Sequence, residues 1–404
     1  MKIGRVLPPA LAPITLGNIF SGVAGIFSPE KSLARFTNEL QKAFGASHCE
    51  TVSSGKTALY CILKSLQKLS PEKNEVLIPA FNCYCVASAV LRAGLKIRLC
   101  DIDPNTLDFD GNALVKELEN KDCLLCVVAT HLFGMHANVK KLKSCINDDS
   151  IFIVEDAAQV MGGKENEIPL GMQADVGFFS LGRGKAYTTC EGGIICTDRN
   201  DIAKGVHDVV ATLPKYNFLE MCVMLIKAKI ILIFSKPGLF WIPKSLPFLG
   251  LGETHFEADF KIRRLSGFQA GMSRGWIKAL EKIRAERSEN NSHWVKFFNE
   301  NQLPGIAGIA KTKSASLDLL RFPIRMQNKE ICKKVLEQSD KLGLGITITY
   351  PLPLHQLPQV SGFATNAFPN AKQCSDTIVT IPVHRSVSKS DIRKIEKLIK
   401  AICI

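Results

Sequence analysis

The sequence lacks the features that would assign it to several large classes at once. Its 404 residues contain no uncharged apolar run of 18 residues, no internal repeat and no low-complexity tract. A conventional membrane-spanning helix, a solenoid and a disordered chain are therefore not expected. Pro8, Pro9 and Pro13 interrupt the apolar N-terminus, which is not typical of a secretory signal. Hydrophobic residues make up 46% and charged residues 22%, as in a globular protein with one large or two medium domains.

The 14 cysteines form no framework of regularly spaced pairs. Cys123 and Cys126 form a CxxC, but no second ligand pair follows at a spacing that suits zinc. Several cysteines lie in apolar runs, where buried free thiols are the ordinary outcome. We therefore expect a reducing, cytoplasmic setting and no metal site.

Acidic residues are scarce only in the last third of the chain. Residues 261–404 hold 24 Lys and Arg against 11 Asp and Glu, whereas residues 1–260 hold 27 of each. This asymmetry indicates two domains and an anionic partner for the second. The basic residues are dispersed, and no aromatic-basic motif or recognition helix accompanies them, so nucleic acid is not the expected partner.

Short apolar runs alternate with helical patterns through the first half of the chain. Strands are expected at 76–80, 96–103, 123–131, 151–156, 175–180 and 192–198, and helices at 31–46, 57–69, 86–93 and 137–146. This alternation predicts an α/β domain with a largely parallel sheet. Because ligands of such sheets bind outside the carboxyl ends of the strands, polar residues that follow the strands are the candidates for a site.

One candidate is the string Ser54-Gly55-Lys56-Thr57, placed just before a helical run. Free N–H groups at a helix N-terminus, beside a glycine that lets an anion approach, suit a phosphate. A P-loop would need a glycine where Glu50 stands, so that motif is excluded. An ordinary capped helix start explains the string equally well.

Two further candidates follow strands at 151–156 and 175–180. Asp156 ends the first strand, where a carboxylate can face a cation such as a protonated ring nitrogen or can simply cap a helix. Ser180 ends the second, and a glycine-containing loop then leads to Lys185, which could react with an aldehyde or be a solvated surface lysine. Together, a phosphate site, a carboxylate and a lysine match what pyridoxal phosphate requires.

These residues belong to a series of motifs that resembles the DegT/StrS aminotransferases, which are fold type I pyridoxal-phosphate enzymes acting mainly on nucleotide-linked keto sugars. In chain order the motifs are Ser54–Leu59, Pro79–Asn82, Glu155–Gln159, Phe179-Ser180 with Lys185, Glu191-Gly192-Gly193, Tyr350–His355 and Ile381–His384. The resemblance extends from about residue 30 to the end. It implies a large domain with a mostly parallel seven-stranded sheet flanked by helices, and a smaller α/β C-terminal domain.

The resemblance also implies roles for individual residues. Lys185 would bind the cofactor aldehyde and move the proton, Asp156 would hold the ring nitrogen, and Gln159 would contact the phenolic oxygen. The phosphate would be held by Ser180 and the turn Gly55-Lys56-Thr57, and the substrate would lie near Tyr350 and His355. Relatives that dehydrate sugars have lost the lysine, so Lys185 favours transamination. The expected partners are an amino acid, with glutamate first, a keto sugar, and a second subunit in a homodimer with shared active sites.

Four positions depart from the family pattern. Lys56 stands where a threonine is usual, Cys83 replaces an aromatic that stacks on the ring, Cys190 replaces a glycine, and Ile262 replaces an asparagine that reaches the neighbouring subunit's phosphate. Arg263 or Arg264 could take over that last contact. These departures motivate a second hypothesis, a homologue that binds pyridoxal phosphate without turnover and acts as a regulator or membrane-associated scaffold.

Residues 218–250 form an unusual apolar segment between the two expected domains. It could be core or dimer interface, or it could lie on a membrane surface with its lysines at the headgroups and Trp241 at the interface. Spanning is disfavoured because Glu220, Lys227 and Lys229 would be costly in hydrocarbon. We thus expect a cytoplasmic protein that is either free or peripheral on the inner face of the membrane. The expected divisions are an N-terminal extension 1–30, a cofactor domain 31–215, the apolar segment 216–255 and a C-terminal domain 256–404.

Overall fold

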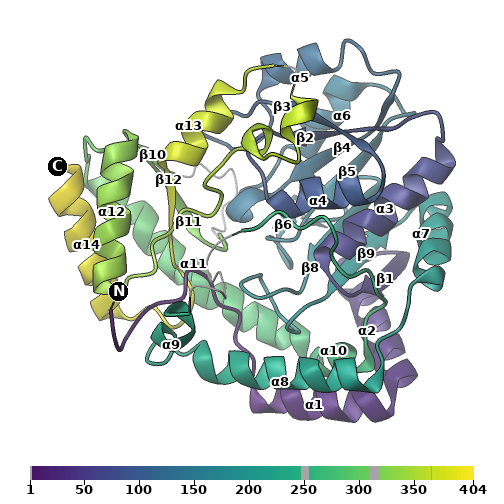
Figure 1. The fold of residues 1–404 in the computed structure, drawn as a ribbon, viewed down its shortest axis with the longest axis horizontal. Coiled ribbons are helices and arrows are strands. Elements are labelled where there is room, and N and C mark those ends of the chain that lie inside the picture. Colours follow the sequence, from purple (N-terminus) through teal and green to yellow (C-terminus); the bar gives the residue numbers. More distant parts are fainter. Residues whose placement is uncertain (1, 247–253, 310–317, 365) are drawn as a thin grey trace.

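The computed structural model describes residues 2–246, 254–309, 318–364 and 366–404. A large sheet with its helices occupies one side of the molecule, and a smaller sheet with the last helices occupies the other (Figure 1). Both chain termini lie on the side of the smaller sheet (Figure 1). The two sheets fall within the segments 31–215 and 256–404, while the exact domain boundaries stay a prediction.

The large sheet has seven strands in the order β1-β9-β8-β5-β4-β2-β3. The strands are β1 (His48–Val52), β2 (Glu75–Pro79), β3 (Lys96–Cys100), β4 (Leu124–Thr130), β5 (Phe152–Asp156), β8 (Val176–Ser180) and β9 (Gly193–Thr197). The five strands from β3 to β8 pair in parallel, and β9 and β1 pair antiparallel at one edge. The predicted α/β fold with a mostly parallel sheet is therefore confirmed. A two-stranded hairpin of β6 (Lys164–Glu165) and β7 (Ile168–Pro169) follows β5.

Helices cover both faces of this sheet, and alternate strand residues pack under different helices. They are α2 (Pro29–Phe44), α3 (Gly55–Leu69), α4 (Tyr84–Arg92), α5 (Gly111–Glu117), α6 (Val139–Ile146) and α7 (Asn200–Thr212), with a 3-10 turn η1 (Leu132–Gly134). Ile78 and Val128 belong to the cluster with α3 and α4 residues, whereas Leu77 and Val127 belong to the cluster with α5 and α6 residues. Burial on both faces explains why these strands are continuous apolar runs in the sequence.

The C-terminal part combines a three-stranded antiparallel sheet in the order β10-β11-β12 with long helices. Its elements are α11 (Trp276–Glu300), β10 (Ile306–Ile309), β11 (Phe322–Met326), α12 (Lys329–Leu342), η3 (Leu354–Gln356), η4 (Ser361–Phe363), α13 (Pro369–Thr377), β12 (Ile378–Ile381) and α14 (Lys389–Cys403). The segment Tyr350–His355 runs from this part back to the large sheet, where the Leu354 N–H donates to the Ala80 carbonyl oxygen (2.8 Å).

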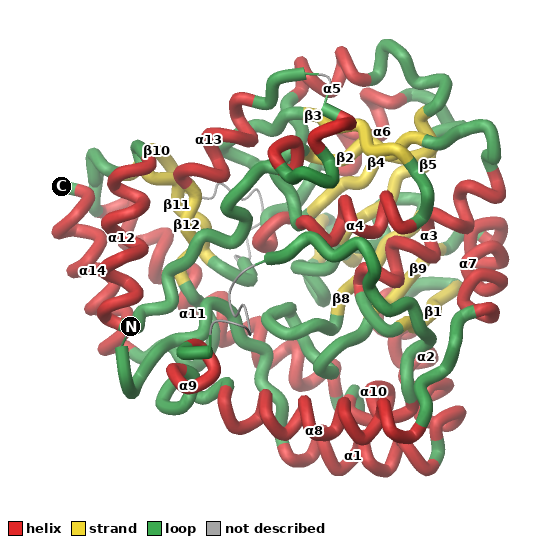
Figure 2. Tube along the Cα trace, in the orientation of Figure 1, coloured by secondary structure: helices red, strands yellow, loops and turns green. Residues whose placement is uncertain are grey.

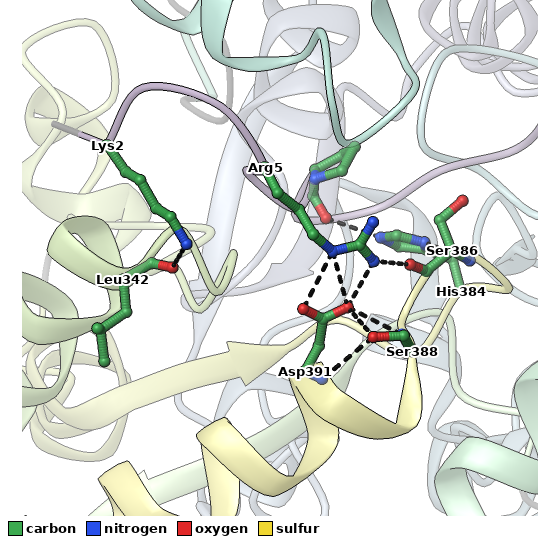
Figure 3. A network of polar contacts seen from close by, with 8 residues as sticks. Lys2, Arg5, Leu342, His384, Ser386, Ser388 and Asp391 are labelled. Atoms are coloured by element: carbon green, nitrogen blue, oxygen red, sulfur yellow. Dashed lines mark hydrogen bonds and ion pairs between the residues drawn. The ribbon is translucent and has the colours of Figure 1, made fainter.

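The N-terminal residues are tied to the C-terminal part by polar contacts (Figure 3). The Arg5 guanidinium donates to the Asp391 carboxylate, with Nη2 to Oδ2 at 2.5 Å, and to the Ser386 carbonyl oxygen at 2.9 Å. His384 accepts at Nδ1 from the Ser386 N–H and donates from Nε2 to the Pro8 carbonyl oxygen at 2.8 Å. These contacts fix residues 2–8 against the start of α14.

Two apolar helices lie together along one edge of the molecule, α1 (Leu16–Phe27) and α8 (Phe218–Phe234) (Figures 1 and 2). α1 packs closely on α10 (Gly267–Met272) because glycines line the contact, and a Cβ added to Gly25 would come within 2.2 Å of the Gly267 carbonyl oxygen. A short helix α9 (Trp241–Lys244) follows α8, and residues 247–250 of the apolar segment lie outside the described residues. None of the described helices combines the length and apolarity needed to cross a bilayer.

Candidate active site

Two adjacent carboxylates at the end of β5 have different surroundings, because successive residues of a strand point to opposite faces. Glu155 is fully buried and accepts hydrogen bonds from the Gly171 N–H (2.6 Å), the Gln173 N–H (2.8 Å) and the His131 Nε2–H (2.8 Å). His131 is a donor at Nε2 because its Nδ1 accepts from a backbone N–H. Glu155 is thus a structural group that holds the loop after β7.

Asp156, the other carboxylate, is buried beside the charge of Lys185. The Ala158 N–H donates to its Oδ1 at 3.1 Å, and no second hydrogen bond to this side chain occurs within the described residues. Burial raises the pKa of Asp156, and the nearby Lys185 opposes the rise. A carboxyl group in this setting gains most from a cation that approaches its free oxygen.

The loop after β8 returns the Lys185 side chain to this edge of the sheet. The Gly182 N–H donates to Ser180 Oγ at 3.3 Å, and the Lys185 N–H donates to the Gly182 carbonyl oxygen at 3.3 Å. Lys185 is half-buried, and its charge acts on both Asp156 and Cys83. The structure therefore brings together the predicted lysine and the predicted carboxylate, which are 29 positions apart in the sequence.

The start of α3 and the end of β8 meet at one place. Ser54 caps α3 by accepting from the Thr57 N–H (3.1 Å), and a Cβ added to Gly55 would lie 2.9 Å from the Ser180 Cβ. The buried Thr57 hydroxyl is engaged locally, with Oγ1 2.9 Å from Ser54 Oγ and 3.0 Å from Ser53 Oγ. Backbone N–H groups of α3 and the Ser180 hydroxyl can therefore reach one anion between them.

The Lys56 side chain takes no part in this arrangement. It forms an ion pair with Glu257, and its Nζ lies 4.9 Å from the centre of the Phe260 ring. A cation held in this way is directed toward the segment before α10 and away from Ser180. The part of Lys56 that fits the predicted phosphate role is its backbone N–H.

Gln159 and Tyr350 lie in contact on the other side of the site. Gln159 Nε2 donates to the Tyr350 hydroxyl at 3.4 Å, and Gln159 Oε1 accepts from the Phe133 N–H at 3.1 Å. Tyr350 stacks on Phe133 with 5.7 Å between ring centres and meets Phe81 edge-on at 5.8 Å. Gln159 is thereby oriented by two neighbours from distant parts of the chain.

His355 lies apart from this cluster. Its ring packs on Phe368 at 5.1 Å, and burial lowers its pKa, with Asp101 as the nearest opposing charge. Within the described residues no contact joins His355 to Lys185 or Asp156. Its role toward a substrate stays a prediction.

Arg263 and Arg264, which were considered for a neighbouring subunit's phosphate, are both engaged within the chain. Arg263 forms an ion pair with Glu220 of α8 at 2.6 Å and donates to the Lys215 carbonyl oxygen at 2.9 Å. Arg264 donates to the Ala211 carbonyl oxygen. A contact across a dimer would have to compete with these partners.

Two polar residues of the site were missed by the sequence analysis in these roles. Arg321 precedes β11, donates to Thr349 Oγ1 at 3.2 Å and lies near Tyr350 and Cys83. Burial lowers its pKa, and no acidic group acts on it within the described residues. Cys83 stands where a ring-stacking aromatic was expected. A hydrogen bond from Cys85 and the charge of Lys185 lower the pKa of the Cys83 thiol to about 6, although burial opposes this effect.

The residues present fit pyridoxal phosphate. The cofactor needs a lysine, an acid for its ring nitrogen and donors for its phosphate. Lys185 is the lysine, and Asp156 is the acid, with one oxygen that accepts no hydrogen bond within the described residues. The Gly55–Ser180 junction offers the donors for a phosphate, and Gln159 adds an amide. A side chain larger than glycine at position 55 would crowd Ser180, since an added Cβ lies 2.9 Å from the Ser180 Cβ.

Together, the doubly wound sheet and the groups at the carboxyl ends of β5 and β8 define a fold type I transferase. A family model of the DegT/DnrJ/EryC1/StrS aminotransferase family matches residues 24–213 and 253–400. The chain belongs to this family, so the resemblance inferred from the motifs is confirmed. The match leaves out residues 1–23 and 214–252, which contain all of α8 and most of α1.

Known proteins similar to this chain act on sugars or cyclitols according to their names. The spore coat polysaccharide biosynthesis protein SpsC of Bacillus subtilis is 20% identical over 388 residues, covering 94% of this chain and 91% of that protein. L-glutamine:2-deoxy-scyllo-inosose aminotransferase of Streptomyces lividus is 28% identical over 47% of this chain and 45% of its own length. The chain thus spans about half the length of several curated relatives that it matches.

Solved structures share the fold at low identity. The E. coli GDP-4-keto-6-deoxy-D-mannose-3-dehydratase with bound hydrated PLP superposes with a TM-score of 0.76 at 18% identity, and each chain is covered completely. At this identity the likeness establishes the fold alone.

Proposed function

We propose that this protein is a pyridoxal-phosphate-dependent aminotransferase that moves an amino group from an amino acid to a keto sugar. The observation that carries the proposal is the convergence of Lys185 and Asp156 at the carboxyl edge of the sheet in a member of this family. Glutamate is the proposed donor and a nucleotide-linked keto sugar is the proposed acceptor, for amino-sugar or envelope-glycan biosynthesis. The names of relatives, which include an L-glutamine:2-deoxy-scyllo-inosose aminotransferase and a GDP-perosamine synthase, support this substrate class.

Each residue of the site has a proposed task. When bound, pyridoxal phosphate supplies an aldehyde that takes up the amino group and a ring that withdraws electrons from the reacting carbon. Lys185 carries the proton between the two carbons that exchange it, since its amino group lies at the sheet edge beside Asp156. Asp156 keeps the ring nitrogen protonated, and that positive charge in turn favours its carboxylate form.

The remaining residues position the cofactor and the donor. Ser180 and the backbone of Gly55, Lys56 and Thr57 hold the phosphate, and the Gln159 amide donates to the phenolic oxygen. Arg321 is the proposed partner of the donor's carboxylate, because it is a cation near Cys83 and Tyr350 without an acidic neighbour in the described residues. Arg321→Gln should raise the KM for glutamate, whereas Arg325→Gln, whose Nη2 contacts Asn105, should leave it unchanged.

A homodimer with shared active sites completes this proposal. It rests on the family pattern and assigns no role across the subunits to Ile262, whose apolar side chain cannot donate a hydrogen bond. Size measurement by light scattering tests the dimer independently of catalysis.

The function is tested by a single-turnover assay. The protein is loaded with pyridoxal phosphate, mixed with glutamate, and the 2-oxoglutarate released is counted per active site. About one equivalent is expected without an acceptor, and continuous release is expected once a keto sugar is added. Cofactor binding without any 2-oxoglutarate, from glutamate or other amino acids, would favour the non-catalytic homologue instead.

A further inference from the structure

The edge formed by α1 and α8 exposes large apolar side chains in unusual number. We name this surface the α1–α8 face. Phe20 and Phe27 of α1 are 72% and 81% exposed, and Leu219 of α8 is 74% exposed. The face consists of Leu16, Phe20, Phe27, Leu219, Val223, Ile226, Ile230 and Ile233. Large exposed apolar side chains concentrated on two packed helices mark an interaction site.

On α8, five of the exposed apolar residues form a single stripe, and exposed Phe218 lies beside it at the start of the helix. Leu219, Val223, Ile226, Ile230 and Ile233 recur at intervals of four and three, which places them on one side of the helix. The opposite side is already used, since Met224 and Ala228 are buried against the body of the protein. α8 is therefore apolar on two opposite sides, of which the side with Met224 and Ala228 is covered and the stripe is exposed.

Two lysines border the stripe; Lys227 is paired with Glu191 at 3.1 Å, and Lys229, which forms no ion pair within the described residues, supplies the free positive charge. Lys227 is one turn from Val223, and Lys229 is one turn from Ile233, so the two lysines flank the stripe on opposite sides. The acidic residue of α8, Glu220, is neutralised by its ion pair with Arg263 at 2.6 Å. α1 contains no charged residue.

Both helices lie largely outside the part of the chain that the family model matches. The α1–α8 face therefore lies largely outside the residues that the family model matches. The lysines also bear on the nature of a partner for this face. Packing two copies of α8 antiparallel about their centres would bring the two Lys229 side chains into the contact without a free acid on either helix.

We propose that the α1–α8 face docks this protein onto the surface of an anionic phospholipid bilayer. The apolar stripe and the two phenylalanines enter the boundary between headgroups and acyl chains, and Lys229 contacts lipid phosphates, while Lys227 stays paired with Glu191. Docking at the surface agrees with the lack of a spanning helix among the described residues. The proposal does not depend on the proposed activity.

Docking would hold the active-site edge close to the membrane. Lys227 Nζ lies 3.1 Å from Glu191 Oε1. Glu191 precedes Gly192 and Gly193, and Gly193 packs on the Ser54 carbonyl oxygen. The docked helix is therefore in direct contact with the loop beside the phosphate position.

Vesicle flotation tests this proposal with the full-length protein. Wild type should float with vesicles of phosphatidylcholine and phosphatidylglycerol, bind pure phosphatidylcholine at least tenfold more weakly, and lose binding in high salt. The double variant Ile226→Gln/Ile230→Gln and the variant Lys229→Glu should each weaken binding by roughly tenfold. Ile277→Gln and Lys282→Glu on α11 are matched controls, since both sites are exposed elsewhere, and they should bind as wild type does.

Two results would overturn the proposal. One is equal or absent binding of wild type to anionic and neutral vesicles. The other is vesicle binding that survives in the α8 variants. A dimer that dissociates in Ile226→Gln/Ile230→Gln, in a protein that does not float, would assign the face to a second copy. Because the changed side chains are exposed, the variants should fold as wild type does, and melting curves check this.

Discussion

Ser180 lies directly against Gly55, so closely that a Cβ atom on Gly55 would approach the Ser180 Cβ to 2.9 Å. This relationship joins the start of α3 to the end of β8 across the site. It explains why glycine stands at the first position of the helix, where φ is ordinary and conformational freedom is not required.

Gly55→Ala should weaken cofactor binding. The added methyl group either displaces Ser180 or fills the phosphate position, and overpacking of this kind costs about 1–3 kcal/mol. Affinity for pyridoxal phosphate should fall roughly 10- to 100-fold in an absorption titration. Gly238→Ala is the matched control, because a Cβ there meets nothing within 4 Å. An unchanged affinity in Gly55→Ala would remove this junction from the phosphate site.

Replacing Asp156 should impair turnover, whereas replacing its neighbour Glu155 should impair stability. Asp156→Asn keeps the oxygen that accepts from Ala158, so the fold should persist while turnover falls roughly 100-fold or more. Glu155→Gln presents an amide N–H to backbone donors and should lower the free energy of unfolding by about 1–3 kcal/mol. Denaturant melts and initial rates of both variants separate the two effects. Similar rate losses in both folded variants would contradict the assignment.

Among the half-buried cysteines of the cofactor-free protein, Cys83 should react fastest with a thiol reagent. Its pKa of about 6 makes it a thiolate above that pH, whereas the pKa of Cys85 is raised well above its ordinary value. The rate of carbamidomethylation, followed by peptide mass spectrometry, should rise through a midpoint near pH 6 for Cys83. Lys185→Ala should move this midpoint upward, because it removes one of the favourable charges. A midpoint that stays at the ordinary pH of a cysteine would contradict this prediction.

The contacts of the N-terminal residues should make stability depend on acid. Despite burial, hydrogen bonds from Arg5 and Ser388 lower the pKa of Asp391 to about 2, so its contribution is present above about pH 4 and is lost as the pH falls toward 2. Burial lowers the pKa of His384 to about 4, so stability also falls between about pH 6.5 and 4, where the unfolded chain binds the proton.

Arg5→Ala should reduce the lower of these two steps, since the hydrogen bonds from Ser388 remain, and should cost about 1 kcal/mol of stability at pH 7 after allowance for solvent screening. Thermal melts from pH 7 to 2.5 measure both steps. Arg92→Ala is the control, because its partner Asp259 is 88% exposed and the pair should contribute little. Parallel pH profiles of wild type and Arg5→Ala would show that the ion pair is not responsible.

The sequence predicted the strands that are buried on both faces, because each is an uninterrupted apolar run. It did not predict β1, whose string HCETV mixes polar and apolar residues and becomes a strand through pairing with β9. α1 was read only as an apolar N-terminus, since its glycines reveal their purpose only through close packing on α10. The sequence of α8 shows no helical alternation of apolar and polar residues, because opposite sides of the helix are both apolar.

The motif residues Asp156 and Ser180 lie at the carboxyl ends of β5 and β8, because strand ends meet there in any parallel sheet. Among the neighbours that tune them, Tyr350 and Cys83 were expected at the site from the motifs, whereas Arg321 was not. Arg321, Tyr350 and Cys83 are far apart in the sequence, and only tertiary packing brings them together. Likewise, the sequence alone could not show that Glu257 takes the Lys56 side chain.

The most direct test of the account is the visible absorption spectrum of the protein with pyridoxal phosphate, before and after glutamate, in wild type and Lys185→Ala. Lys204→Ala, at an exposed position on α7, serves as the control. Wild type and Lys204→Ala should show a band of lysine-bound cofactor that glutamate bleaches, and Lys185→Ala should lack this band. The same band in Lys185→Ala, or none in wild type with excess cofactor, would contradict the assignment of Lys185 and with it the proposed catalysis.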